Sequence, residues 1–484
     1  MRTLIDLLRD WMPEQRWFRG SGASELRHLG SYVLEHIGDD EDVYRIIVAL
    51  IVDEQTLPES GSVPAATIYQ VPLVLREADS DASARGYLGS IQHDGASRTV
   101  IDGPHDPAFA AALLALVASE GQAGGETGDD VTRAFGLPMP GIQLGNFASS
   151  RVLDGEQSNT SIICEMRRDD EAATPIIMKV FRILADGDNP DVTLQTALAS
   201  AGSRRVPAVV GNVSGMWLDP RVSDRPARGN LVFVQEFLPG VEDAWRAALR
   251  AGASGDDFLT PARTLGQATA EVHAVLRKVM PTVPTTPERV EAALAAMRTR
   301  LDAAIAEVPA LAEFRERALA CFAAARDAEW PILQRIHGDY HLGQVLAVPG
   351  RNWVLLDFEG EPLSPLEVRN APDCAVRDVA GMLRSFDYVS GSLTMTAGSE
   401  QAHDWAIAAR KAFIEGYGEG LVEQGIEGKE LRALLDERVC AAYEIDKALY
   451  EARYEALHRP DWLGIPMGAI ERLLGERESA ASNR

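Results

Sequence analysis

The sequence predicts an α+β protein, in which a small mixed unit and an antiparallel sheet precede a lobe of helices. Residues 1–90 alternate between one amphipathic helix and strand-like runs, residues 140–240 hold apolar runs rich in β-branched side chains, and residues beyond 240 turn rich in Ala, Leu, Glu and Arg. No repeat of 20–50 residues is present, which argues against a solenoid. A chain of 484 residues corresponds to about three domains, and its 46% hydrophobic fraction is ample for buried cores.

The first domain is expected over residues 1–90 as a small α+β subdomain. Its first helix carries apolar side chains at helical spacing, namely Leu4, Leu7, Leu8 and Trp11. Residues 43–52 are typical of a strand.

The second domain is expected over residues 91–240, around one antiparallel sheet. A short helix is predicted over residues 110–118, and residues 119–130, rich in Gly and acid, are interpreted as a flexible loop. The strands of the sheet are predicted at residues 160–166, 176–181 and 231–237.

The third domain is expected over residues 241–484 as a helical lobe. Its helices are predicted near residues 260–280, 287–306, 310–328, 402–420 and 429–457.

The charge balance limits the partners. Lys and Arg number 47 against 72 Asp and Glu, a net charge of −25, so neither nucleic acid nor a membrane surface is an expected partner. The surplus acid predicts either a solvated surface or a docking face for a basic partner. No run of about 18 apolar residues occurs, and Asp6 interrupts the place of a signal peptide's apolar run, so we expect a soluble cytoplasmic protein. The four cysteines lack metal-ligand spacing and are expected to be reduced and buried.

The chemistry is expected in a non-helical interruption of the helical lobe, residues 336–346, and in residues 353–361 that follow. Gln344 lies five residues after Asp339, the spacing of Asp and Asn in a kinase catalytic loop, and Asp357 lies 18 residues after Asp339, where the metal-binding Asp of kinases falls. Phosphoryl transfer needs an acceptor for the nucleophile's proton and a metal clamp on the phosphates. We therefore predict a kinase-like phosphotransferase with Asp339 as the base and Gln344 and Asp357 as Mg²⁺ ligands. The alternative is an ordinary turn with a helix-capping aspartate.

ATP is expected to bind upstream, on the sheet. Lys179 is a lone cation in an apolar strand, as the phosphate-binding lysine of kinases is, and the alternative is a snorkelling edge lysine. Its acidic partner stays open among Asp186, Asp188 and Asp191.

Two further segments are candidates for nucleotide contacts. The glycine-rich loop of protein kinases is missing, but Ser158, Asn159 and backbone amides can still cap a phosphate. Residues 235–240 are typical of a hinge beside adenine, with Gln235, Glu236 and Leu238 as the candidates, or of a plain strand-to-helix turn.

Several blocks resemble one known family, the actinobacterial maltokinases, a branch of the aminoglycoside-phosphotransferase-like superfamily. These blocks are HGDxHxGQ at residues 337–344, LLDFEGEP at 355–362, RDVAGMLRSFDY at 377–388, the start at 11–18 and the late segment 443–463. The resemblance spans nearly the whole chain. It implies a bilobal protein-kinase-like fold with an extra N-terminal cap, which uses ATP and Mg²⁺ to convert maltose to maltose 1-phosphate for α-glucan and glycogen synthesis.

The resemblance also carries residue roles onto matching positions. It implies that Asp339 is the base, that Gln344 and Asp357 bind the metal, and that Lys179 contacts phosphate. The chain departs from the family at Tyr340, where Leu is expected, and at Thr193, where Glu is more usual, so the partner of the lysine stays open.

The acceptor sugar is expected to lie against acidic and aromatic side chains, because carboxylates accept from neighbouring hydroxyls and rings cover a pyranose face. The predicted acceptor-binding residues are His337, His341, Glu359, Glu444, Tyr450, Glu451, Tyr454 and Trp462. His337 could instead brace its turn, Glu359 could bind the metal, and the late helix could simply be packed by its Tyr and solvated by its Glu residues. An acid at a helix start, Asp378, is expected to hold the backbone amides of the catalytic loop.

Other functions stay open from the sequence. An acidic cradle would also suit the ammonium group of glucosamine, of another aminosugar or of an aminoglycoside. A non-catalytic pseudokinase or scaffold is a separate class of alternative. A monomer is expected, and association with other α-glucan enzymes is left open.

Overall fold

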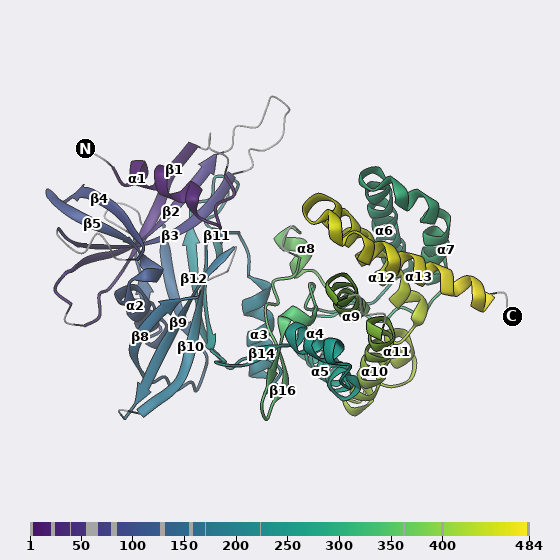
Figure 1. The fold of residues 1–484 in the computed structure, drawn as a ribbon. Helices are drawn as coiled ribbons and strands as arrows, with labels where there is room; N and C mark the ends of the chain where they lie inside the picture. The colour runs from purple at the N-terminus through teal and green to yellow at the C-terminus, as the bar shows by residue number, and fades with distance from the viewer. Residues whose placement is uncertain are drawn as a thin grey trace. The chain divides into compact units, whose positions relative to one another are not determined.

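The computed structural model describes residues 3–20, 25–38, 40–54, 66–78, 85–125, 131–153, 158–169, 171–222, 224–361, 364–397 and 401–481. The chain divides into two compact units, Met1–Thr196 with Ala208–Pro239, and Ala197–Pro207 with Gly240–Arg484. Figure 1 shows the first unit built mainly of strands and the second mainly of helices. The order predicted from the sequence, a mixed unit and an antiparallel sheet before a helical lobe, is confirmed.

The first unit begins with a cap, residues 3–105, in which an amphipathic helix packs on an antiparallel sheet. Its elements are α1 (Leu4–Trp11), η1 (Met12–Glu14), β1 (Glu25–Leu34), β2 (Val43–Glu54), β3 (Ala66–Glu77), β4 (Tyr87–His93), β5 (Ala96–Asp102) and η2 (Gly103–His105), with the strand order β1-β2-β3-β5-β4. Thr3 and Asp6 form a capping box at the start of α1, which satisfies backbone amides that the helix leaves free. Leu7 and Leu8 of α1 are buried against the sheet. The amphipathic first helix is therefore confirmed.

The cap sheet continues past residue 90, where the sequence placed the end of the first domain. Strands β4 and β5 form a hairpin whose turn holds Asp94 and Gly95, both at positive φ. The β5 strand then pairs with β3 inside the cap sheet. A hairpin that closes a sheet belongs to that sheet, so the cap extends to the residues that lead into α2 (Pro107–Ala118).

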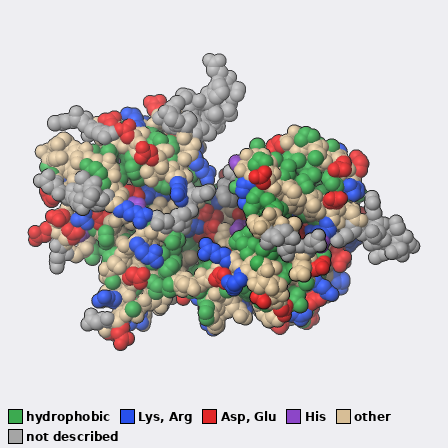
Figure 2. All heavy atoms as spheres, viewed as in Figure 1, with side chains coloured by type: hydrophobic (Ala, Val, Ile, Leu, Met, Phe, Trp, Pro, Cys, Tyr) green, Lys and Arg blue, Asp and Glu red, His purple; other side chains and the backbone are tan. Residues whose placement is uncertain are grey.

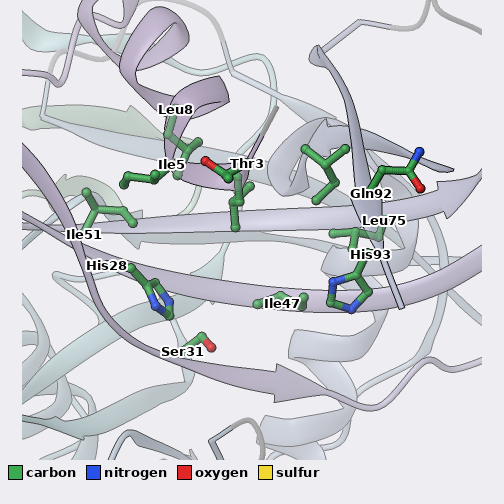
Figure 3. Close-up of a pocket in the computed structure, with 12 residues that line it drawn as sticks. Thr3, Ile5, Leu8, His28, Ser31, Ile47, Ile51, Leu75, Gln92 and His93 are labelled. Carbon is green, nitrogen blue, oxygen red and sulfur yellow. The ribbon is translucent and has the colours of Figure 1, made fainter. Parts of the chain in front are cut away.

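A cavity of about 470 Å³ lies between α1 and the cap sheet (Figure 3). Its walls are mostly apolar and include Leu8, Ile47 and Leu75, while His28 and His93 supply polar atoms. Its volume falls in the range of small-molecule pockets. The apolar core of the cap is therefore not filled by its own side chains at this point.

The second part of the first unit is a seven-stranded antiparallel sheet. Its strands are β6 (Gln122–Ala123), β7 (Arg133–Pro138), β8 (Asn146–Val152), β9 (Asn159–Arg168), β10 (Glu171–Phe181), β12 (Val209–Trp217) and β13 (Ala227–Glu236), in the order β6-β7-β12-β13-β10-β9-β8. The three apolar runs predicted as strands fall in β9, β10 and β13, which lie side by side in the sheet. The predicted antiparallel sheet is confirmed.

Residues 119–130, interpreted from the sequence as a flexible loop, are held in place over the part that the structure describes. Gln122 and Ala123 pair with β7, and the amide of Val33 in the cap donates to the carbonyl of Gly124 at 3.0 Å. The expectation of a flexible loop is therefore wrong for residues 121–125, because their backbone groups find partners in two sheets. Residues 126–130 lie outside the described residues.

The cap is fastened to the sheet by buried polar contacts. Arg182, just after β10, donates from Nη2 to both carboxylate oxygens of Asp102, at 3.0 and 3.2 Å. The side-chain amide of Gln70 donates to the carbonyls of Phe181 and Leu231 at 2.9 and 3.0 Å, and the short strand β11 (Ile183–Leu184) pairs with β3. The strand that carries Lys179 therefore runs directly into the contacts with the cap.

The second unit is helical, and α3 (Pro190–Ser200) passes from the first unit into it. Its elements are α4 (Ala244–Ser254), α5 (Leu259–Val279), α6 (Pro287–Glu307), η3 (Pro309–Phe314), α7 (Arg315–Arg326), η4 (Leu342–Gln344), α8 (Leu366–Asn370), α9 (Val376–Ala397), α10 (Gln401–Glu423), α11 (Gly428–Leu434), α12 (Glu437–His458), η5 (Pro460–Trp462) and α13 (Gly464–Ala481). Helices are present in all five predicted segments, but residues 310–328 are divided between the 3-10 helix η3 and α7, and residues 429–457 are split into α11 and α12. Asp436 causes the break, because its side chain accepts the amide of Arg438 and starts a new helix.

A small antiparallel sheet interrupts these helices. It contains β14 (Glu242–Asp243), β15 (Val345–Val348) and β16 (Asn352–Leu355), with β15 in the middle. Val345 pairs with Leu355, so the residue before β15 and the residues after β16 emerge at the same end of the hairpin. This hairpin brings Gln344 to the segment that contains Asp357.

The surface is charged and mixed. On the face shown in Figure 2, acidic side chains are spread among basic and apolar ones in both units, as expected of a solvated surface. No described helix is long and apolar enough to cross a bilayer. None of the four cysteines, all of which lie within the described residues, forms a disulfide, and Cys440 is only half-buried, contrary to the expectation that all are buried.

Candidate active site

The catalytic loop, residues 336–344, is held in place by Asp378 in the first turn of α9. The carboxylate accepts the backbone amides of His337 at 2.8 Å and Gly338 at 2.9 Å, and the ring of His273 lies 3.1 Å away. Burial alone would raise the pKa of Asp378, but the hydrogen bond and charge of His273, with smaller contributions from the loop, hold it below the ordinary value. Asp378 is therefore a buried carboxylate that fixes the loop, as the sequence predicted.

His337 braces this loop from inside. The side chain is buried, and its Nε2 lies 2.8 Å from the carbonyl oxygen of Leu356. Its ring packs in a tilted arrangement against Phe358, with the ring centroids 4.6 Å apart. A ring so engaged joins the catalytic loop to the segment after β16. This geometry favours the bracing role over the predicted contact with the acceptor.

Asp339 presents a carboxylate that is paired on one oxygen only. Its Oδ1 accepts from Lys447 Nζ of α12 at 3.3 Å, while its Oδ2 has no hydrogen-bond partner within the described ranges. Burial alone would raise the pKa of Asp339, but the charges of Lys447, His341 and His337 outweigh burial and lower it. Asp339 is therefore ionised at neutral pH, with Oδ2 left to accept a proton.

Lys447 binds a second carboxylate as well. Its Nζ lies 3.2 Å from Glu361 Oε1, and Arg377 lies 3.2 Å from the other oxygen of Glu361. Burial would lower the pKa of Lys447, but the charges of Asp339 and Glu361 raise it above the ordinary value. The sequence reasoning did not select Lys447 as a site residue.

Gln344 and Asp357 meet as a pair of oxygen donors. The amide nitrogen of Gln344 donates to Asp357 Oδ2 at 2.9 Å, which leaves the amide oxygen for a ligand. Asp357 adopts a φ of 59°, a conformation that is costly for a non-glycine residue and clusters at functional sites. Carboxylate oxygens of Asp357 and Glu359 approach within 4.8 Å. Oxygen donors of this kind suit a hard divalent cation such as Mg²⁺.

His341 lies beside the same charges. Its Nδ1 accepts the amide of Gly343 at 3.1 Å, and burial lowers the pKa of its ring although Asp339 and Asp357 oppose that effect. His341 is therefore neutral at pH 7 and keeps its place by a hydrogen bond within the loop.

In the first unit, Lys179 pairs with Asp191. Lys179 Nζ lies 3.1 Å from Asp191 Oδ2, and Gln195 donates to the other oxygen at 2.6 Å. Of the three aspartates that the sequence offered as partners of Lys179, Asp191 is the one that forms the ion pair. Its neighbour Asp186 pairs instead with Arg225 at 2.7 Å. The less usual Thr193 faces its own helix, where its hydroxyl donates to the carbonyl of Asn189 at 3.3 Å.

The other nucleotide candidates lie on β9 and β13. Asn159 begins β9, with Ser158 just before it, and residues 154–157 of the candidate phosphate loop lie outside the described residues. Glu236 ends β13 and accepts the amide of Ala208 at 3.0 Å, while Leu238 is half-buried. Gln235 Oε1 is buried and finds no hydrogen-bond partner in the described part of the chain. A buried acceptor without a partner is a place for a ligand's donor.

The acidic residues predicted as sugar ligands on α12 are committed to arginines. Glu444 lies 2.8 Å from Arg410, and Glu451 Oε2 accepts two hydrogen bonds from Arg384 at 2.9 and 2.7 Å. Both glutamates are buried. Burial raises the pKa of Glu451 despite its arginine partner. These contacts favour a packing role for both residues.

The aromatic candidates are divided between two environments. Tyr450 lies with its ring 5.1 Å from Lys447 Nζ, next to Asp339 and Glu361. Trp462 stacks on Tyr388 at 6.4 Å, and Tyr454, 42% exposed, contacts His458 at 4.6 Å. Of the three, Tyr450 is the one that the structure brings to the carboxylates of the catalytic loop.

The fold and these side chains are those expected of a kinase-type phosphotransferase. They include a lysine paired with an acid on a helix, an aspartate in the loop 336–344, and a Gln and an Asp that a hairpin brings together. Comparison with known families agrees. The phosphotransferase enzyme family matches residues 169–360, and the maltokinase N-terminal cap domain matches residues 11–106.

Two curated relatives are named glucosamine kinase. The protein of Streptacidiphilus jiangxiensis is 30% identical over 370 residues, 72% of this chain and 80% of its own length. That of Mycolicibacterium smegmatis is 31% identical over 343 residues, 68% of this chain and 80% of its own length. The chain therefore belongs to the phosphotransferase enzyme family, among the kinases that carry a maltokinase N-terminal cap. It is a phosphotransferase that acts on a hydroxyl acceptor.

A solved structure shares the whole fold. Glucosamine kinase in complex with glucosamine, ADP and inorganic phosphate superposes with a TM-score of 0.65 and 23% sequence identity, over 98% of this chain and 100% of that chain. The two-lobed kinase fold with an N-terminal cap, expected from the sequence, is confirmed.

Proposed function

We propose that the protein transfers the γ-phosphoryl group of ATP to the anomeric hydroxyl of maltose, giving maltose 1-phosphate and ADP for α-glucan synthesis. The observation that carries this proposal is the match of residues 11–106 to a maltokinase cap in a chain that also keeps Asp339, Gln344 and Asp357. The polar groups of the second unit support the chemistry, because Asp339 and Gln344 each keep an oxygen atom that makes none of the hydrogen bonds described above.

The first unit would bind the nucleotide. Lys179, oriented by Asp191, would contact phosphate oxygens as a point charge. The unpartnered Gln235 Oε1 would accept a hydrogen bond from a donor such as the amine of adenine, beside the backbone of Glu236 and Leu238. Ser158 and Asn159 would cap a phosphate from the start of β9.

In the second unit, the amide oxygen of Gln344 and the carboxylate of Asp357 would hold Mg²⁺, with Glu359 close enough to share it. A Mg²⁺ ion held by these residues would supply positive charge to offset that of the phosphates. Asp339 Oδ2 accepts the proton of the sugar hydroxyl as that oxygen bonds to phosphorus and the bond to ADP breaks. Asp378 keeps this carboxylate in place through the loop backbone.

The test is an assay with ATP, Mg²⁺ and maltose that follows ADP formation and the reducing end together. Phosphorylation of the anomeric hydroxyl blocks the reducing end, so the two signals change in equal amounts. ADP formed while the reducing end persists would exclude this position of transfer. An Asp339→Asn preparation serves as the matched control for ATPase contamination.

Glucosamine is the second candidate acceptor. It is favoured by the two curated relatives named glucosamine kinase, at 30% and 31% identity. Turnover of maltose and of glucosamine at equal concentration separates the two proposals. A pseudokinase is disfavoured, because Lys179, Asp339, Gln344 and Asp357 are all present.

A further inference from the structure

Lys447 places a positive charge where the acceptor must arrive. Its Nζ lies 3.3 Å from Asp339 Oδ1, the proposed base, and 3.2 Å from Glu361 Oε1. Its side chain is 25% exposed, so most of it is shielded from bulk water. Arg377 adds a second cation on the far oxygen of Glu361.

Each carboxylate at this position is already in contact with a cation of the chain itself. Lys447 contacts both Asp339 and Glu361, and Arg377, which also pairs with Asp373 at 2.7 Å, contacts Glu361. An acidic cradle attracts an ammonium ligand only where its charge is not compensated. A cationic aminosugar that approached Asp339 would meet a like charge, which is how binding sites reject a wrong ligand.

Lys447 can also donate a hydrogen bond to a neutral sugar. An ammonium group has three N–H donors, and the two carboxylates use two of them. The third can donate to a hydroxyl or ring oxygen of a bound sugar, and the ring of Tyr450, 5.1 Å from Nζ, offers an apolar face beside it.

We propose that Lys447 is a specificity-determining residue of the acceptor site, which selects a neutral sugar over a cationic aminosugar by occupying the position of the ammonium group. This inference rests on the proposed sugar-kinase function and deepens it. It predicts that this chain prefers a neutral sugar and that a variant without Lys447 loses this preference.

The experiment compares glucose with glucosamine, which differ by a hydroxyl against an ammonium group on the same ring, and maltose is measured alongside. Assays at pH 6.5 keep the amine protonated, below about 7.7, the ordinary range of an α-amino group. The ratio of kcat/KM for glucose to that for glucosamine is expected to exceed about tenfold in the unaltered protein, a difference of about 1.4 kcal/mol. In Lys447→Met this ratio is expected to fall by about tenfold or more, and in Lys447→Arg to stay near the original value.

The controls separate charge from folding. Lys411→Met removes an exposed lysine, 78% accessible, and should leave the ratio unchanged. Glu361→Gln removes one partner of Lys447, so the excess positive charge should raise the ratio further. Equal losses on both sugars in Lys447→Met, or a preference of the unaltered protein for glucosamine, would overturn the inference. If the unaltered protein transfers phosphate to no sugar, the proposed function fails, and this inference fails with it.

Discussion

Asp378 Oδ1 accepts the backbone amide of Gly338 at 2.9 Å, which anchors the residue just before Asp339 to the start of α9. Gly338 has a φ of 85°, and a Cβ on it would come within 3.2 Å of Gly360 Cα. A glycine is needed where the backbone is both left-handed and closely approached. The position of Asp339 therefore depends on a buried acid 39 residues away, and the acid itself touches no substrate atom in the proposed mechanism.

Asp378→Asn tests this anchor. Asp378 accepts the amides of His337 and Gly338 on two different oxygens, and asparagine has an oxygen at only one of these positions. One buried backbone amide therefore loses its acceptor, at a cost of about 1 to 3 kcal/mol in the free energy of unfolding. Urea unfolding measures the loss. Asp256→Asn, at an exposed position of the same unit, is the control and should be nearly neutral.

The unaltered protein and the Asp378→Asn variant should also differ in how their stability depends on pH. The pKa of Asp378 is lowered on folding, chiefly because His273 outweighs burial, with His337 adding to the effect. Because the pKa is lower in the folded state, the unfolded chain binds more protons as the pH falls. The contribution of Asp378 to the free energy of unfolding is therefore complete above the unfolded pKa of about 3.9, and it is lost as the pH falls through the folded pKa. The stability difference between the two proteins should be constant from about pH 5 upward and shrink below about pH 4. A difference that grew on acidification would contradict the assignment.

Asp339→Asn tests the proposed base. Loss of a positioned base lowers kcat by about 10² to 10⁴. Folding should change little, because the Asp339 side chain is 26% exposed and asparagine has nearly the same size and shape. Steady-state ADP formation and a melting curve measure the two effects. Unchanged kcat in a folded Asp339→Asn protein would remove Asp339 from the mechanism.

Asp357→Asn tests the proposed metal ligands. The variant loses a charged oxygen donor to a hard cation, so the Mg²⁺ concentration for half-maximal rate should rise as the maximal rate falls. A magnesium titration of the rate is the measurement, with Asp256→Asn again as the control. An identical Mg²⁺ dependence in both proteins would exclude Asp357 as a ligand.

Arg182→Met tests how the cap is fastened. The variant leaves Asp102 buried without its guanidinium partner, a change that costs about 3 to 5 kcal/mol in unfolding free energy. Arg225→Met removes a pair whose arginine side chain is 53% exposed and should cost no more than about 1 kcal/mol. The double variant Arg182→Met with Asp102→Leu should recover much of the loss, because it leaves no unpaired charge. Equal effects of both single variants would show that the cap contact is weak.

Much of the fold could be predicted because its signals are local. Apolar runs gave β9, β10 and β13, and helical periodicity gave α5, α6 and α10. The prediction of a flexible loop was wrong at residues 121–125. Their Gly-rich composition does not reveal that Gln122 and Ala123 pair with another strand, β7. The predicted domain boundary at residue 90 likewise separated the hairpin of β4 and β5 from its sheet. The sequence does not show that β5 pairs with β3, which lies earlier in the chain.

Candidate site residues could be predicted where their spacing along the chain matches that of a kinase catalytic loop. Asp339, Gln344 and Asp357 follow from their offsets, and the hairpin of β15 and β16 explains why Gln344 meets Asp357. Lys447 lies 108 residues after Asp339, so its contact depends on how α12 packs, which no local pattern encodes. One signal was available, since a lysine shared a helix face with Tyr450. The choice of Asp191 for Lys179 likewise required the orientation of α3.

The central claim is transfer of phosphate to the anomeric hydroxyl of maltose, and the position of the phosphate in the product tests it most directly. The ³¹P NMR spectrum of a reaction with ATP, Mg²⁺ and maltose should show a new phosphate ester coupled to the anomeric proton of the reducing-end glucose. An ester coupled instead to other protons of the sugar, or ATP consumed with no sugar phosphate formed, would contradict the account.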